Sequence, residues 1–388
     1  MQTENCLYPE YPPSCIDKRK LHLHTQLMLL LSLGLAPLKG ESADLPPGFS
    51  ETQITAQLKD PTRIKFSPDG RLFILQQGGD IRIVKDGKLL DQPFLSLKTD
   101  SRGEHGILGI EFDPEFEKNS FIYLYYTTLI PEVHNRVSRF QVQGDRALPE
   151  TEKVLIELDP VGHSIFHSAG DLHYHTDGKL YVSVGDNANR KNAPILTNPF
   201  GKILRFNLDG SIPEDNPFYK TGSALGRAIW ALGFRNPFSF HFQKETGRLY
   251  ANEVGAESWE EINDVKPGLN YGWPDAEGYS TDTRFEGPIY SYSHGPITSD
   301  TQGCAITGGT FYTATTGGFP RNFHGMYFFI DYCNAWLRTL NPEDHQVALF
   351  GKQLAANPVS LEVSPDGKLY YVSRWYNALY SIQYQPPH

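Results

Sequence analysis

Residues 66–74 read FSPDGRLFI, and near copies recur at 174–182 (YHTDGKLYV) and 363–371 (VSPDGKLYY). A weaker copy, FQKETGRLY, stands at 242–250. In each copy a glycine that can adopt a positive φ follows Asp or Thr, and an alternating run of β-forming residues comes next. This pattern is typical of a tight hairpin between two strands. The repeated unit of the chain is therefore predicted to be a β-hairpin.

Two more divergent copies, FDPEFEKNSFIYLYY at 112–126 and FPRNFHGMYFFID at 319–331, bring the repeats to six. Units of this length with several short strands are typical of propeller blades, and a closed ring removes exposed sheet edges. The last unit has room for about three strands, so we expect 49–58 to supply the fourth and close the ring. We predict an all-β, six-bladed β-propeller over residues 44–388, with a two-domain β-sandwich as the alternative.

The amino-acid composition agrees with this fold class, and the net charge argues against one class of partner. The 388 residues include 35 glycines, 28 prolines, 21 tyrosines and 23 phenylalanines, which favours short strands and turns over helices. The formal net charge is -10. Phosphate backbones would be repelled by that charge, so nucleic acid is not expected as a partner.

The N-terminal residues have the organisation of an export signal. Lys18, Arg19 and Lys20 precede an apolar run at 27–38, and small residues follow at 40–43. The run is shorter than the ~20 residues that a membrane-spanning helix needs. We predict a signal peptide at 1–43 and a periplasmic or secreted protein, with a buried helix as the alternative.

Removal of that signal would leave two of the four cysteines, Cys304 and Cys333. An oxidising compartment would allow them to form a disulfide. Two buried free thiols are the alternative, and the sequence does not decide between them.

Charged and polar residues gather beside glycines in four segments, where the loops of a propeller would converge on its central channel. Taken singly, each has a structural explanation: a surface histidine, a capped turn, or a solvated run of acids. The tryptophan of NYGWP is interpreted as core packing rather than a binding platform. The segments are 103–106, 167–171 with 185–187, 233–237, and 253–263 with 270–274.

Together these segments resemble the soluble quinoprotein glucose and sorbosone dehydrogenase family, which includes aldose sugar dehydrogenases and, more distantly, Hedgehog-interacting-protein-like modules. The resemblance runs from about residue 45 to 384. Members are six-bladed β-propellers, in agreement with the repeat count. The motifs that carry it are LPPGF at 45–49, PTRIKFSPDGRLFI at 61–74, GILGIEFDPEF at 106–116, GKILRFNLDGSIPEDNPF at 201–218, GFRNP at 233–237, EEIN at 260–263 and NYGWP at 270–274.

The resemblance implies an oxidoreductase that uses pyrroloquinoline quinone (PQQ) and Ca²⁺ to oxidise an aldose or related sugar, with an electron acceptor as a possible partner. His167 matches the base that takes the sugar's anomeric proton, and Asp186 matches the acid beside it. Arg235 and Asn236 match residues that contact the quinone. Glu104 matches a Gln or Glu position at the sugar side of the cofactor site.

The resemblance also implies two calcium sites. The carbonyls of Gly255 and Ala256 would hold the ion that binds the quinone. Glu261 and the carbonyl of Tyr271 match a separate structural site. Oxygen ligands of this kind are those that Ca²⁺ prefers.

One departure from the family concerns cofactor binding. PQQ has three carboxylates, and tight binding requires cationic side chains that pair with them. Relatives carry a Lys in the fifth blade and Arg residues before the last PDG hairpin, whereas 331–334 and 355–358 contain no cation here. Arg338 and Arg374 are the nearest candidates to replace them. A propeller that binds carbohydrate or protein without turnover is therefore the alternative function, and calcium-dependent lactone hydrolysis is a further one.

Overall fold

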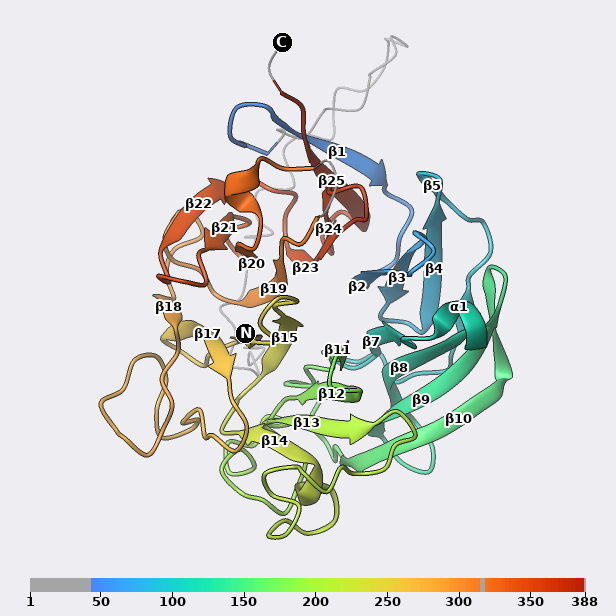
Figure 1. Cartoon of the computed structure of the whole chain (residues 1–388), viewed down its shortest axis with the longest axis vertical. Helices are drawn as coiled ribbons and strands as arrows, with labels where there is room; N and C mark the ends of the chain where they lie inside the picture. The colour runs from blue at the N-terminus through green and yellow to red at the C-terminus, as the bar shows by residue number, and fades with distance from the viewer. Residues whose placement is uncertain (1–42, 315–317, 387–388) are drawn as a thin grey trace, which may run out of the picture. The chain divides into compact units, whose positions relative to one another are not determined.

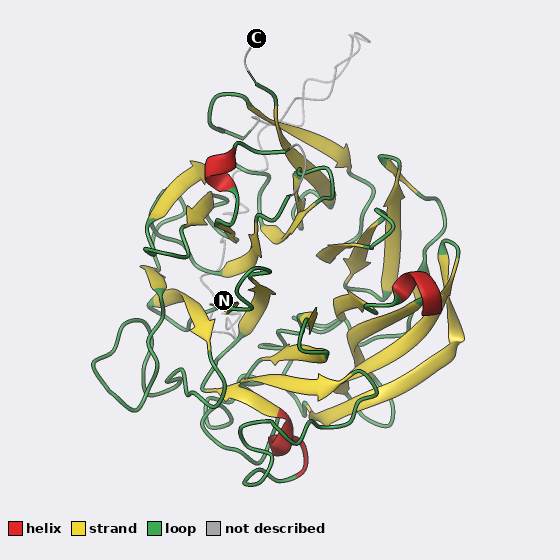
Figure 2. Cartoon of the chain, viewed as in Figure 1, coloured by secondary structure: helices red, strands yellow, loops and turns green. Residues whose placement is uncertain are grey.

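The computed structural model describes residues 43–314 and 318–386. Apart from Ala43, the predicted export signal lies outside these residues. Strands dominate the described chain (Figure 2), and its helices are the short α1 (Phe116–Asn119), η2 (Ala224–Ala228) and η3 (Arg321–Phe323). Among the described residues, no helix is both long and apolar enough to cross a membrane.

The described strands form six antiparallel sheets, and we number these blades 1 to 6 (Figure 1). From the innermost strand outward, the first three are blade 1 with β2 (Pro61–Phe66), β3 (Leu72–Gln76), β4 (Asp80–Lys85) and β5 (Lys88–Leu89), blade 2 with β7 (Ile107–Phe112), β8 (Phe121–Thr128), β9 (His134–Gln143) and β10 (Arg146–Pro160), and blade 3 with β11 (Leu172–His175), β12 (Lys179–Val184), β13 (Lys202–Asn207) and β14 (Ile229–Leu232). A further short strand, β6 (Leu95–Ser96), pairs with β4.

The other three sheets follow the same order. They are blade 4 with β15 (Pro237–Phe242), β16 (Leu249–Glu253), β17 (Trp259–Val265) and β18 (Tyr290–Ser293), blade 5 with β19 (Ile306–Phe311), β20 (Tyr327–Asp331), β21 (Leu337–Leu340) and β22 (Val347–Gly351), and blade 6 with β23 (Pro358–Val363), β24 (Leu369–Ser373), β25 (Ala378–Tyr384) and β1 (Phe49–Thr55). This confirms the predicted all-β, six-bladed β-propeller over the two-domain sandwich.

The ring closes as the sequence predicted. Strand β1 pairs antiparallel with β25, with Phe49 opposite Tyr384. The Phe49 ring also lies 4.9 Å from that of Phe350 in blade 5, so the closure is packed as well as hydrogen-bonded. The expected strand ran to 58, but the observed one ends at Thr55.

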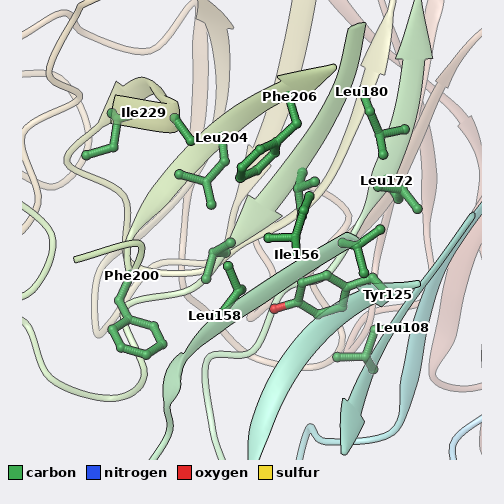
Figure 3. Close-up of a cluster of buried hydrophobic side chains, with 14 of the residues drawn as sticks. Leu108, Tyr125, Ile156, Leu158, Leu172, Leu180, Phe200, Leu204, Phe206 and Ile229 are labelled. Atoms are coloured by element: carbon green, nitrogen blue, oxygen red, sulfur yellow. The ribbon is translucent and has the colours of Figure 1, made fainter. Parts of the chain in front are cut away.

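Apolar side chains fill the spaces between neighbouring blades. Figure 3 shows the cluster between blades 2 and 3, where Leu108 and Tyr125 pack against Leu172 and Leu180. All four are buried, with at most 7 % of their surface exposed. Burial of this kind is the main favourable term in folding, at about 25 cal/mol for each Å² of apolar surface.

The turns fall on two opposite faces of the ring. In an antiparallel meander the turn between the first and second strands lies at one end, and the turn between the second and third lies at the other. The repeated hairpins are turns of the first kind, and their glycines adopt the expected positive φ, +85° at Gly70 and +80° at Gly367. Turns of the second kind share the opposite face with the loops that lead into each blade. We call that opposite face the loop face.

The innermost strands surround a small central cavity of about 10 Å³ that is crossed by buried ion pairs. Arg63 contacts Asp171 at 2.9 Å, and Lys65 contacts Glu111 at 3.3 Å and Glu362 at 3.5 Å. The Lys65 ammonium helps to hold the pKa of Glu111 down to about 2 against the effect of burial. The channel therefore contains a network of charged side chains that was not predicted from the sequence.

Candidate functional site

A buried histidine and aspartate form a pair on the loop face. His167 lies in the loop that leads into β11, and Asp186 follows β12. Nδ1 of His167 is 2.6 Å from Oδ1 of Asp186, and the indole Nε1 of Trp273 donates to the other carboxylate oxygen at 2.8 Å. Because Nδ1 faces a carboxylate, it carries the proton, and Nε2 is left with a lone pair. No hydrogen bond reaches that Nε2 from the described residues, so it is free to accept a proton.

The local backbone explains why these two loops meet. His167 adopts a left-handed conformation with φ +58°, which turns its side chain toward the loop after β12. A Cβ on Gly185 would lie 2.0 Å from the His167 carbonyl oxygen, so only glycine permits this approach. The fully buried Lys202 donates to three backbone carbonyls of the same loop, those of Asn192, Ala193 and Phe200.

A second group connects Glu104 to the histidine loop through Asn236. The Asn236 amide donates to the Glu104 carboxylate at 3.0 Å and accepts a hydrogen bond from the Ala169 N–H at 3.1 Å. The same Glu104 oxygen accepts from the Ser168 N–H at 3.2 Å. Three loops far apart in sequence are thus linked directly beside His167.

Arg235 is buried next to this group. Its guanidinium donates to the carbonyl of Val254 at 3.2 Å and lies 5.9 Å from the centre of the Trp273 ring. No carboxylate lies within 4.0 Å of that guanidinium among the described residues. Its backbone carbonyl accepts a hydrogen bond from the Asp186 N–H at 2.7 Å, so the arginine and the aspartate are neighbours.

Trp273 reaches the site by an unusual path. The chain leaves β17 at the hairpin face and returns along blade 3, where Asn270 bridges to Leu232 of β14. The indole then lies at the loop face against Asp186. The interpretation of this tryptophan as core packing was wrong, because its side chain is only partly buried and is bonded to the site.

A small cavity of about 10 Å³ lies behind Arg235, with room for one ion or water. Glu253, Glu261 and Tyr271 line it. Burial raises the pKa of Glu253 well above its ordinary value, and burial raises the pKa of Glu261 to about 7. One Glu253 oxygen is buried without a hydrogen-bond partner. Two buried carboxylates, one of which has an oxygen without a hydrogen-bond partner, are a set of donors that fits a hard divalent cation.

The turn after β16 offers further oxygen atoms. The carbonyls of Gly255 and Ala256 accept no hydrogen bond among the described residues. Glu277 holds the turn in shape, because one of its carboxylate oxygens accepts backbone N–H groups from Ala256 to Trp259 at 2.9 to 3.3 Å. The free carbonyls are therefore held in a fixed backbone conformation on the loop face.

The stretches that lack the expected cations also lie on the loop face. Cys304 and Cys333 are disulfide-bonded, which decides the alternative that the sequence left open. Arg338 donates to the Tyr290 hydroxyl and to the Asp300 carbonyl. Both of its partners belong to the outer part of blades 4 and 5. Arg374 instead donates to Gln77 of blade 1 at 2.5 Å.

The structure brings the predicted site residues into two neighbouring groups. His167, Asp186, Arg235, Asn236 and Glu104 form one. Glu261 and Tyr271 line the cavity beside it, and the Gly255 backbone shares that lining. Sequence reasoning missed Glu253 as a lining residue, although it begins one of the polar segments, and it underestimated Trp273.

Comparisons with known proteins identify the family of this chain. The sequence profile of the Glucose / Sorbosone dehydrogenase family matches residues 58–375. Fold, motif order and profile together define a six-bladed β-propeller of the glucose and sorbosone dehydrogenase type. This chain belongs to the Glucose / Sorbosone dehydrogenase family.

Two curated relatives illustrate the range of that family. Quinoprotein glucose dehydrogenase B of Acinetobacter calcoaceticus is 28 % identical over 309 residues, which cover 70 % of this chain and 64 % of that protein. Human Hedgehog-interacting protein is 28 % identical over 221 residues, 49 % of this chain and 31 % of that protein. The chain thus matches less than two thirds of the length of either relative.

A solved structure confirms the fold. The PQQ-bound form of aldose sugar dehydrogenase from Streptomyces coelicolor superposes with a TM-score of 0.72 at 21 % identity, over 88 % of this chain and all of that one.

Proposed function

We propose that this protein is a PQQ- and calcium-dependent oxidoreductase that oxidises an aldose or related sugar. Membership of the family supports the reaction class, and the name of the Acinetobacter relative supports a quinone cofactor. The observation that carries the proposal is the buried His167–Asp186 pair, which is hydrogen-bonded through the Asp186 N–H to the backbone of Arg235. Among the described residues the Arg235 guanidinium has no carboxylate partner.

When bound, the quinone supplies the electrophile that accepts hydride from the sugar. His167 removes the proton of the anomeric hydroxyl through Nε2, and the sugar, having lost a hydride and a proton, leaves as the lactone. The Asp186 carboxylate stabilises the resulting imidazolium, and Trp273 fixes the orientation of that carboxylate. The Arg235 guanidinium supplies positive charge where negative charge develops.

Two groups of oxygen atoms support the proposal of two calcium ions. The Gly255 and Ala256 carbonyls would hold the ion beside the cofactor, and Glu261 with the Tyr271 carbonyl would hold the structural ion. The orphan oxygen makes Glu253 a further ligand of the second site.

We infer that the protein works in the periplasm or outside the cell. A basic segment followed by an apolar run and small residues supports export of the chain. The Cys304–Cys333 disulfide is what an oxidising compartment favours.

The test is reconstitution followed by removal of the base. Protein treated with chelator and then given PQQ and Ca²⁺ should reduce an electron-accepting dye with at least one sugar of an aldose panel. In His167→Asn, turnover should fall by about 10²- to 10⁴-fold, the usual contribution of a general base, while the quinone still binds. Asparagine is chosen because it tolerates the positive φ of this position.

The matched control is His163→Ala, an exposed histidine in the same loop, which should keep full activity. Loss of quinone binding in His167→Asn would recast His167 as a structural residue.

A propeller that binds carbohydrate or protein without turnover is the second candidate. The absence of cations at 331–334 and 355–358 favours it. Wild-type protein that binds neither PQQ nor Ca²⁺ would support this candidate over the dehydrogenase.

A further inference from the structure

Arg374 begins the turn between β24 and β25 and so lies on the loop face. Its guanidinium Nη2 donates to the side-chain oxygen of Gln77 at 2.5 Å. The Gln77 amide donates in turn to the carbonyls of Gly103 and His105 at 2.6 and 2.9 Å, which fixes the orientation of its oxygen. Arg374 is therefore held against the loop that carries Glu104.

The charge of Arg374 is not neutralised by the protein. Among the described residues, no carboxylate lies within 4.0 Å of this half-buried guanidinium, and Gln77 is neutral. On the same face, the exposed Arg102 is paired with Asp100 at 2.7 Å. A guanidinium has five N–H donors arranged to grip a carboxylate with two parallel hydrogen bonds, so Arg374 keeps donors available for an acidic ligand.

Arg374 also lies near the two stretches, 331–334 and 355–358, that lack the cations found in relatives. The Arg374 N–H donates to the Asn357 carbonyl at 3.1 Å, and the Asn357 amide donates to the Tyr332 carbonyl at 3.3 Å. Its positive charge acts on the Tyr332 phenol, where it opposes the rise in pKa caused by burial. One arginine from the β24–β25 turn thus lies beside both stretches in which the cations are missing.

The residues after Arg374 are suited to a ring-shaped ligand. Trp375 and Tyr376 expose 67 % and 51 % of their surface. The exposed rings of Trp375 and Tyr376 offer flat apolar faces on which a ring-shaped ligand can pack, with a cation beside them.

We propose that Arg374 binds a carboxylate of a ligand at the loop face, replacing from a different strand the cations missing at 331–334 and 355–358. The inference rests on the proposed function for the choice of ligands. Two ligands offer that chemistry: the quinone, through one of its three carboxylates, and a uronic acid, which is a sugar with a carboxylate.

The experiment measures binding rather than turnover. Wild type, Arg374→Gln and Arg374→Lys are titrated with PQQ in the presence of Ca²⁺, followed by quenching of tryptophan fluorescence, and with glucuronate and glucose by calorimetry. The control Arg146→Gln removes the same charge from an exposed position next to the outer strand edge of blade 2. Thermal unfolding checks that all variants fold.

If the quinone is the ligand, Arg374→Gln raises the Kd for PQQ by about tenfold or more, the usual effect of a lost charge-assisted hydrogen bond, and Arg374→Lys recovers part of it. If the uronic acid is the ligand, only the Kd for glucuronate rises and that for glucose does not. Wild type that binds PQQ or glucuronate with no change in Arg374→Gln overturns the proposal and leaves the proposed function standing. Wild type that binds neither ligand overturns both.

Discussion

Stabilisation of the folded protein by Ca²⁺ should depend on pH, because the proposed ligand Glu261 titrates near neutral pH. Burial raises the pKa of this carboxyl to about 7 in the folded chain from an ordinary value of 4.5. A raised folded pKa means that the folded state holds its proton more tightly than the unfolded state. In chelator, the stability is therefore fully present below pH 4.5 and falls as the pH rises to about 7.

The magnitude follows from the shift. A rise from 4.5 to about 7 costs about 3 kcal/mol above pH 7, at 1.36 kcal/mol for each pH unit. About 340 described residues unfold with an entropy of about 0.7 kcal/mol/K, so the melting temperature should fall by about 5 °C between pH 4.5 and 7.5 from this group. Ca²⁺ at about 100 times its Kd should return about 2.7 kcal/mol at pH 7.5.

The test variant is Glu261→Gln. A neutral amide removes the cost of ionisation, so in chelator at pH 7.5 this variant should melt above wild type. Ca²⁺ should raise its melting temperature by less than it raises that of wild type, because only the site at Gly255 and Ala256 remains complete. The amide fits the site because the Gly278 N–H still finds an oxygen, while the unpartnered Asn263 Oδ1 can turn to accept the new N–H group. The exposed Glu257→Gln is the control and should behave as wild type.

Differential scanning fluorimetry at pH 5.0 and 7.5, with chelator or Ca²⁺, measures all four conditions. A wild-type melting temperature that is the same in chelator at both pH values would refute the reasoning. So would a calcium-dependent rise that is as large in Glu261→Gln as in wild type.

Two further outcomes are expected. Gly185→Ala should lower the free energy of unfolding by about 1–3 kcal/mol and reduce turnover, because the new Cβ would lie 2.0 Å from the His167 carbonyl oxygen. The control is Gly287→Ala, whose Cβ would meet nothing within 4 Å. Unfolding in urea and dye reduction compare the two variants, and equal behaviour would contradict the argument from crowding. Replacing Cys304 and Cys333 together by Ser should cost about 3–4 kcal/mol for a link across 29 positions, so dithiothreitol should lower the melting temperature of wild type but not of the double variant.

The fold was predictable because its information is local and repeated. Each hairpin copy joins an alternating run to a residue with positive φ, which is Ser120 in the copy at 112–126 and a glycine in the other five. The short last unit required the strand at Phe49 to complete it. The charged network around Lys65 was not predictable in the same way. Its members occupy single positions on separate inner strands, and only closure of the ring brings them together.

The sequence predicted which residues of the candidate site lie together, but not the hydrogen bonds that join them. Motif order placed His167 and Asp186 in one site, and their 2.6 Å contact agrees. Nothing in the sequence marks Trp273 as a hydrogen-bond donor to Asp186, because the tryptophan reaches the loop face only after the chain has run back along blade 3. The role proposed for Arg374 depends on Gln77 of the neighbouring blade 1, which is 297 positions away in the sequence and becomes a neighbour only when the ring closes.

The separation of the two faces explains how one family can contain relatives with different names. Repeated hairpins such as that at Gly70 lie on one face and specify the blades, whereas the site residues lie in unrepeated loops on the other. Substitution in a loop that only bridges two strands costs little folding energy, because the blade cores are buried between the sheets. The cations missing at 331–334 and 355–358 are changes of this kind. We expect them to alter which ligand the loop face holds, with the guanidinium of Arg374 supplying positive charge there from another strand.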